Sequence, residues 1–387
     1  MQNKARLVWI EILRVVSAFG ILLYHTSLYF THYAFSPSPN GLMSNGQTLV
    51  TVLVDKFGLS LNMLVGFVAL FGFQFLDVFI LLIGLATVLS WRGDEIYVDY
   101  LKRRWLRVLW PFWLAVFFTL VLSALHHYFF GGYLAGAWHW FVAFTYPLAY
   151  DFHGTLLQQI SGPWWFVPFM LAVVVVSPFM LKKLEQWGVK NFLLFFGLLS
   201  LLYRLLSVYL FEAHINFSIM DTAVGEAPFL LFPAKIFLIA LGMAFGKLIK
   251  ERNFTSDRKV IFFVATFLYI LGFVTQFSWL GWTVAEFFYA PAIVMLFYSL
   301  FSEIEDNFLT PVIIKLGALS YSFFLMHNFF AHRLSEYFED GVPSFWKTLV
   351  VSTICSLIIA MLIEKLIPLV SKAFSTIWSA IDKKLIS

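Results

Sequence analysis

The 387-residue chain contains few charged residues and a single cysteine. Charged residues make up only 12% of the sequence, whereas they make up about 25% of an average globular domain. A soluble fold has no means of burying the 61% of residues that are hydrophobic. Because Cys355 has no second cysteine to pair with, an intramolecular disulfide is excluded. The small net charge of +4 is no indication of nucleic-acid binding.

Long apolar runs take the place of the missing charge. A membrane-spanning helix needs about 20 mostly apolar residues. The strands of a membrane barrel are about ten residues long and alternate in polarity, and these runs do neither. The sequence therefore predicts an all-α integral membrane protein, a bundle of about ten transmembrane helices. The predicted spans are residues 7–30, 62–91, 105–126, 164–181, 191–211, 229–248, 260–279, 282–301, 312–331 and 345–370.

The basic residues predict how the bundle is oriented. Cytoplasmic segments of membrane proteins carry an excess of Lys and Arg. With the N-terminus inside, most of the 26 basic residues fall on the inner side, and none lies between Val108 and Leu181. We therefore expect both termini in the cytoplasm and one transmembrane domain over residues 1–387, with no separate soluble domain. The N-terminal run is expected to be retained as the first span, because it is interrupted by charges and no cleavage site follows it.

Two long outer segments are expected at about 31–61 and 130–163. The second is rich in aromatic side chains: Trp138, Trp140, Tyr146, Tyr150, Trp164 and Trp165.

Ionisable residues inside a span need an explanation, because each costs about 2.5–3.5 kcal/mol or more in lipid. In the first span Glu11, Arg14 and His25 share one face, since eleven residues make almost three helical turns. The spacing places Arg14 near the cytoplasmic side and His25 about 16 Å further along the axis. The alternative is that Arg14 extends to the inner interface while His25 lies at the outer one.

Later spans carry further polar residues. Asp77 is expected at a depth close to that of His25, where it either orients an imidazole or pairs with an arginine as a structural link. Ser320 and His327 are seven residues apart on one face, which suits a site and simple helix packing equally well. Three other charged residues lie within predicted spans: Arg204, Lys235 and Glu286. Some of them are expected to line a water-filled lumen.

The segment after the second span reads Lys102-Arg103-Arg104-Trp105-Leu106-Arg107. On a helix, Arg104 and Arg107 lie on the same side. Such a pair can hold phosphates through charge-assisted hydrogen bonds. The ordinary excess of positive charge in cytoplasmic segments explains these residues without any ligand.

Five short motifs in order resemble the acyltransferase-3 family of membrane O-acyltransferases, and they extend from about residue 9 to 327. Glu11 replaces the family's usual Asp, and Ile83 stands where Ser is common. The motifs are Glu11-Ile12-Leu13-Arg14 with His25 ten residues on, Leu76-Asp77-Val78-Phe79 with Gly84, Arg103-Arg104-x-x-Arg107 with Pro111, Gly162-Pro163-Trp164-Trp165-Phe166, and Gly317-x-x-Ser320-Tyr321 with Leu325 and His327.

The resemblance implies transfer of an acyl group, commonly acetyl from acetyl-CoA, to a hydroxyl of an extracytoplasmic glycan or glycolipid. It implies a location in the cell membrane of a bacterial-type envelope, and no metal. The outer aromatic segment would then offer faces for sugar packing, or form an interfacial belt.

The resemblance also implies roles for particular residues. His25 would be the catalytic base, since a partly desolvated imidazole stays neutral and can accept a hydroxyl proton. The expected catalytic residues are His25, Arg14 and Asp77. Those expected to bind the coenzyme are Arg103, Arg104 and Arg107. Those expected to contact substrate are Glu11, Trp164, Tyr321 and His327.

Two other functions fit parts of the pattern. A transporter or flippase for a glycan or lipid intermediate would work without acyl-CoA and would depend on Arg204 and Lys235 more than on His25. A non-catalytic scaffold would tolerate the loss of His25 or Arg14. The buried charges argue against a scaffold, because an inert bundle is more stable without them.

Overall fold

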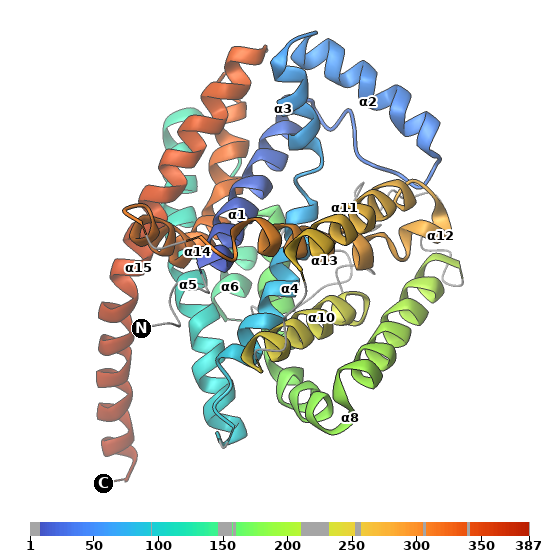
Figure 1. The fold of residues 1–387 in the computed structure, drawn as a ribbon. Helices are drawn as coiled ribbons and strands as arrows, with labels where there is room; N and C mark the ends of the chain where they lie inside the picture. Colours follow the sequence, from blue (N-terminus) through green and yellow to red (C-terminus); the bar gives the residue numbers. More distant parts are fainter. Residues whose placement is uncertain are drawn as a thin grey trace.

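The protein is described by a computed structural model that covers residues 8–93, 95–145, 157, 160–209, 232–251, 257–304, 307–338 and 341–386. The regular elements in these residues are helices, as the apolar runs predicted (Figure 1). They are α1 (Val8–Phe30), α2 (Leu42–Phe57), α3 (Leu61–Leu70), α4 (Gln74–Leu89), α5 (Tyr97–Phe130), α6 (Ala137–Thr145), the 3-10 helix Gly162–Trp165, α8 (Phe166–Tyr209), α10 (Phe232–Lys250), α11 (Arg258–Thr275), α12 (Trp279–Trp282), α13 (Ala285–Phe301), α14 (Thr310–Ser335) and α15 (Val342–Ile386).

Six of the described helices are long and apolar enough to cross a membrane, or seven if α3 and α4 count as one span bent by 48°. From Phe166 to Tyr209, the predicted runs 164–181 and 191–211 fall in one element, α8, whose two arms are visible in Figure 1. The arms meet at Gly188, where φ is 70° and ψ is 168°, a backbone conformation open to glycine.

Two other predicted spans are not among these helices. α13 has only 17 residues, and α10 carries Lys235, Lys247 and Lys250 within its 19 residues. The predicted count of ten spans is therefore not confirmed, because bent, short and charged helices replace several of the expected straight ones.

The outer segment 31–61, expected as a loop, contains the helix α2. This helix begins beside Asn45, whose amide donates to the carbonyl oxygens of Ser38 and Gly41, both at 2.8 Å. Its inner face packs through Leu53 and Phe57 into a core cluster. Polar residues such as Gln47 and Asp55 interrupt its sequence, so it did not stand out as an apolar run. In the other outer segment, Tyr146 and Tyr150 lie outside the described residues.

α1 and α14 pack against each other and run in the same direction. Near their beginnings Gly317 faces Glu11, and a Cβ at Gly317 would overlap the Glu11 carboxylate. Near their ends the Tyr29 hydroxyl donates to Asn328 Oδ1 at 2.9 Å. The polar stripe of α1 therefore lies along α14.

α4 approaches α10 more closely than side chains normally permit. A Cβ at Gly84 would overlap the carbonyl oxygen of Ile239, and a Cβ at Gly242 would overlap that of Leu81. Small residues permit such backbone contact between membrane helices, where packing rather than the hydrophobic effect drives association.

We use the name basic end for the end of the bundle where α1, α5 and α14 begin and α4 ends. Basic residues gather there: Arg92, Arg103, Arg104, Arg107 and Lys315. By charge, this is the end expected to face the cytoplasm.

The contact between α4 and α10 gives a test of the packing. Gly242→Ala is expected to destabilise the protein by about 1–3 kcal/mol, because the added methyl group forces two backbones apart. Unfolding in mixed micelles measures the change. The matched control is Gly46→Ala in α2, where a Cβ meets nothing within 4 Å. Equal stability of the two variants would contradict this contact.

Candidate active site

A cavity of about 360 Å³ lies between α1, α4, α8 and α14. Its volume is near the lower limit for small-molecule sites in proteins. Its walls are mostly apolar, and the polar side chains on them are Glu11, Arg14, Ser90, Ser320 and Tyr321. Three of the predicted site residues, Glu11, Arg14 and Tyr321, therefore share one cavity although they come from opposite ends of the chain.

The cavity runs along the bundle axis. Ser90, where α4 ends, lies at the basic end of the cavity. Phe79 on the same helix lies eleven residues earlier, about 16 Å away along the axis. Phe166 at the start of α8 and Phe324 on α14 join Phe79 there. We call these three phenylalanines the aromatic end of the cavity.

Glu11 and Arg14 form an ion pair in the cavity wall. Arg14 Nη1 lies 3.1 Å from Glu11 Oε2 and 3.2 Å from Oε1. Both side chains are partly exposed, 23% for Glu11 and 33% for Arg14. The predicted shared face is confirmed, and the carboxylate fixes the direction of the guanidinium.

Two residues of α14 complete the middle of the cavity. The Tyr321 hydroxyl donates to the carbonyl oxygen of Val108 at 3.3 Å, so it links α14 to α5. Ser320 also lines the cavity, and its buried hydroxyl has no hydrogen-bond partner among the described residues. Ser320 thus leaves one unsatisfied hydroxyl group in the cavity wall.

His25 and His327 lie together beyond the aromatic end, with their ring centroids 5.1 Å apart. His327 is fully buried, and its Nδ1 contacts the carbonyl oxygen of Phe324. Because a carbonyl can only accept, Nδ1 carries the proton and Nε2 carries the lone pair. His327 Nε2 has no partner among the described residues.

This arrangement gives the pair acid–base capacity. A neutral imidazole is the form that accepts a proton from a hydroxyl group. His25 on α1 and His327 on α14 lie at the same depth in the bundle.

Trp164 lies inside the bundle rather than on an open face. Its side chain is fully buried and packs edge-on against Phe112, with centroids 5.2 Å apart. Its indole Nε1 donates to the carbonyl oxygen of Leu325 at 2.9 Å. Trp164 therefore anchors α14 between Phe324 and His327. The expectation that it contacts substrate has no support in this placement.

The three arginines of the basic segment occupy different environments. Arg103 is paired with Glu95 through two hydrogen bonds, Nε to Oε1 being 2.7 Å. This guanidinium holds the pKa of the Glu95 carboxyl below its ordinary value. Arg104 is half-buried and donates to Ser90, which lines the cavity. Arg107 is exposed. Arg104 thus connects the basic segment to the cavity.

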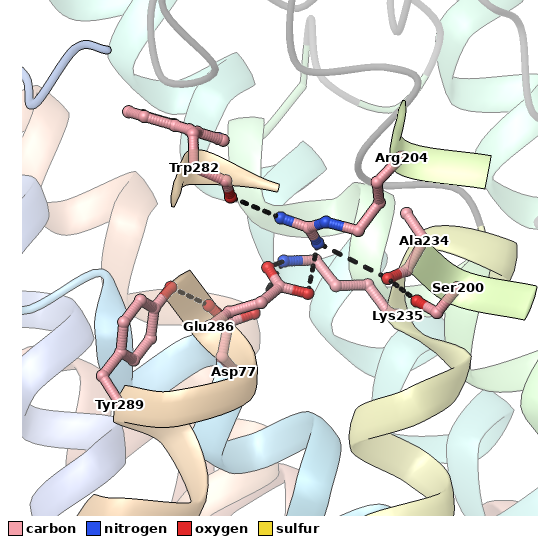
Figure 2. Close-up of polar contacts among 8 residues, drawn as sticks. All are labelled: Asp77, Ser200, Arg204, Ala234, Lys235, Trp282, Glu286 and Tyr289. Carbon is pink, nitrogen blue, oxygen red and sulfur yellow. Dashed lines mark hydrogen bonds and ion pairs between the residues drawn. The ribbon is translucent and has the colours of Figure 1, made fainter. Parts of the chain in front are cut away.

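Asp77 belongs to a different group of charges, drawn in Figure 2. Lys235 Nζ lies 2.7 Å from Asp77 Oδ1, and the Tyr289 hydroxyl donates to the other Asp77 oxygen. The carboxylate therefore contacts a lysine and a tyrosine, rather than the histidine or arginine expected from the sequence. The spacing of residues along one helix does not indicate which neighbouring helix a given side chain contacts.

The same group contains the other buried charges. Glu286 pairs with both Lys235 and Arg204. Arg204 also donates to the carbonyl oxygen of Trp282 at 3.1 Å. Each of these side chains is at most 9% exposed. The expectation that some of them line a water-filled lumen is wrong. We call Asp77, Arg204, Lys235, Glu286 and Tyr289 the ionic cluster.

The ionic cluster joins α4, α8, α10 and α13. Two carboxylates face two cations, so its formal charge is zero, as a low-dielectric interior requires. Sequence reasoning identified four of its members as costly residues. It missed Tyr289, because a tyrosine in an apolar helix gives no comparable signal.

The bundle thus combines membrane-spanning helices with a cavity that extends from the basic end towards a histidine pair. This arrangement suits acid–base chemistry inside a membrane protein. A family model described as an acyltransferase domain matches residues 7–365. The chain belongs to the acyltransferase-3 family of membrane acyltransferases, as its motifs predicted. Neither a search of curated proteins nor a search of solved structures found a match.

The ionic cluster gives a test of stability. Lys235→Met is expected to destabilise the protein by about 3–5 kcal/mol, because it leaves an excess buried carboxylate. Adding Asp77→Asn should restore part of the loss by restoring formal neutrality. Unfolding in mixed micelles provides the free energies for this double-mutant cycle.

The matched control is the exposed pair Arg258–Glu303, whose side chains are 41% and 67% exposed. Arg258→Gln should change stability by no more than about 1 kcal/mol. A similar small effect from Lys235→Met would show that the cluster does not hold the helices together.

Proposed function

We propose that the protein transfers an acyl group, acetyl in the first instance, from cytoplasmic acyl-CoA to a hydroxyl group of an extracytoplasmic glycan or glycolipid. The observation that carries the proposal is the cavity between the basic end and the histidine pair. It supplies a path along which a phosphate-bearing donor can bring its acyl group to a base. Membership of an acyltransferase family supports the reaction class.

The donor's phosphates bind at the basic end. Arg104 and Arg107 are the arginines for this role, because Arg103 already holds Glu95. Arg104 is joined to Ser90, which lines the cavity, so a phosphate held by Arg104 places the attached pantetheine arm at the cavity. Guanidinium groups suit phosphates because their donors match the geometry of the oxygens.

The pantetheine arm lies along the cavity. Its amide groups need hydrogen-bond partners within mostly apolar walls. Arg14, Glu11 and Ser320 are the polar groups there. We therefore assign Arg14 to binding of the donor along the cavity. Arg14 lies too far from His25 along α1 to act in the chemical step, which agrees with this role.

The chemical step takes place at the histidine pair. His25 accepts the proton of the attacking hydroxyl, whose oxygen forms a bond to the thioester carbon. The carbon–sulfur bond breaks, and the thiolate leaves with a proton from the imidazolium. The products are an ester and free coenzyme thiol, so atoms and charge balance. The carbonyl oxygen of Phe324 keeps His327 in one tautomer, with the lone pair on Nε2. His327 lies in this form beside His25.

Asp77 and Trp164 act at a distance in this proposal. Asp77 holds α4, one wall of the cavity, through Lys235. Trp164 holds α14 through the carbonyl oxygen of Leu325. Both are positioning residues. The outer ends of α1 and α14, where Tyr29 contacts Asn328, are the side from which the acceptor hydroxyl reaches the histidines.

Loss of the base is the first test. His25→Ala should lower acetyl-CoA turnover by about 10²–10⁴-fold, the usual contribution of a general base. Its affinity for acetyl-CoA should be unchanged, because the phosphates bind at the other end. Thiol release and equilibrium binding by the detergent-purified protein measure both quantities. His127→Ala, which removes an exposed histidine, is the matched control. Unchanged turnover in a folded His25→Ala protein would contradict the mechanism.

Loss of the phosphate site is the second test. Arg104→Ala and Arg107→Ala should each weaken acetyl-CoA binding by about 10–100-fold, the equivalent of one charge-assisted hydrogen bond. The loss should shrink as salt is raised. Arg258→Ala, which removes an exposed arginine elsewhere, is the control. If folded wild-type protein binds no acyl-CoA, the assignment of the donor is wrong.

A further inference from the structure

The aromatic end of the cavity is a layer built by three helices. Phe324 on α14 contacts Phe166 on α8 with centroids 5.2 Å apart and Phe79 on α4 with centroids 6.2 Å apart. All three side chains line the cavity. Phe166 and Phe324 are each only 3% exposed and belong to the packed core, whereas Phe79 is half-buried.

Phe324 lies between the cavity and the histidine pair. One part of it lines the cavity. Its ring also lies 5.4 Å from the ring of His327, and its carbonyl oxygen binds Nδ1 of that histidine. A group that comes along the cavity therefore meets Phe324 immediately before it reaches an imidazole.

The layer is rigid. The ring of Phe166 stacks on Phe169 with an interplanar angle of 17° and meets Trp165 edge-on. Trp164 fixes the backbone of α14 at the residue after Phe324. Close-packed side chains of this kind yield only when several neighbours move together. The space beside Phe324 is therefore fixed by the fold.

We propose that Phe324, with Phe79 and Phe166, determines the length of the acyl group that the protein accepts, and that it restricts the donor to short acyl groups. This inference rests on the proposed function. Reacting atoms must approach within about 3–3.5 Å, so the thioester carbon has to lie beside the imidazoles. The ring of Phe324 lies at the same place and also lines the cavity, so the acyl chain attached to that carbon packs against it. A longer chain meets a ring that has no room to move. A pocket of this kind discriminates about 10–200-fold for each methylene group.

The test is a chain-length series. Acetyl-, butyryl- and hexanoyl-CoA are bound to the purified protein, and the ratio of the hexanoyl to the acetyl dissociation constant is measured together with thiol release. Wild type should favour acetyl-CoA. Phe324→Ala should lower the ratio at least tenfold, because the removed ring leaves space for the chain. Phe324→Leu should give an intermediate ratio.

The matched control is Phe345→Ala. Phe345 is equally well buried, at 1% exposure, but it belongs to the other core cluster and does not line the cavity. Its ratio should equal that of wild type. A general loosening of the protein would change both variants alike. If Phe324→Ala fails to fold, Phe79→Ala provides the same test from a half-buried position in the same layer.

The outcomes separate the two proposals. Binding of acetyl-CoA by wild type with an unchanged ratio in folded Phe324→Ala and Phe79→Ala would overturn the selection by the aromatic end and leave the proposed function standing. Wild type that binds every chain length equally would overturn it as well. Wild type that binds no acyl-CoA of any length would overturn both.

Discussion

The parallel contact between α1 and α14 sets the position of the polar side chains in the candidate site. Gly317 has no side chain, so Glu11 fits against α14 at the basic end, and Tyr29 bonds to Asn328 at the other. Two parallel helices bring residues of equal depth together. The residues around Arg14 therefore meet those around Ser320 at the cavity, and His25 meets His327. A slip of one turn, about 5.4 Å, would separate the two imidazoles.

α4 connects this contact to the rest of the bundle. Phe79 lines the cavity, while Asp77, two residues earlier, points into the ionic cluster, because successive helical positions face different sides. Further along, Gly84 brings the α4 backbone against α10. Charge pairing and backbone contact thus fix one wall of the cavity. The groups that make these two contacts do not themselves line the cavity near the histidines.

The sequence predicted what is periodic within one helix. The shared face of Glu11 and Arg14 follows from a spacing of three, and the ion pair confirms it. The motifs predicted the family, which the family model confirms. The sequence did not indicate which residues on other helices these side chains would contact. Asp77 was expected to need a partner because an ionised side chain in a membrane span is energetically unfavourable. Nothing in its own helix indicated that Lys235 and Tyr289 would be its partners. The number of spans is not confirmed for a related reason, since the point at which a helix bends or ends, as between α3 and α4, depends on how it packs.

The aromatic residues show the same limit in another form. Trp164 stands in a segment rich in aromatics, where composition favours an exposed platform or a belt. The structure buries it, and its indole reaches a carbonyl of α14. Phe324 gave no signal at all, because a phenylalanine in an apolar span is expected. Only the three-dimensional neighbourhood distinguishes a ring that fills the core from one that separates a cavity from a base.

Apolar walls around the cavity bear on the chemistry as well as on the packing. In the proposed mechanism, a thioester held against Phe79, Phe166 and Phe324 is shielded from water, which would otherwise compete with the acceptor hydroxyl. The histidine pair lies beyond this layer, on the side of Tyr29 and Asn328. In the proposed mechanism the donor and acceptor therefore approach the base from opposite ends of the bundle. Neither has to pass the other, and the acyl group alone crosses between them.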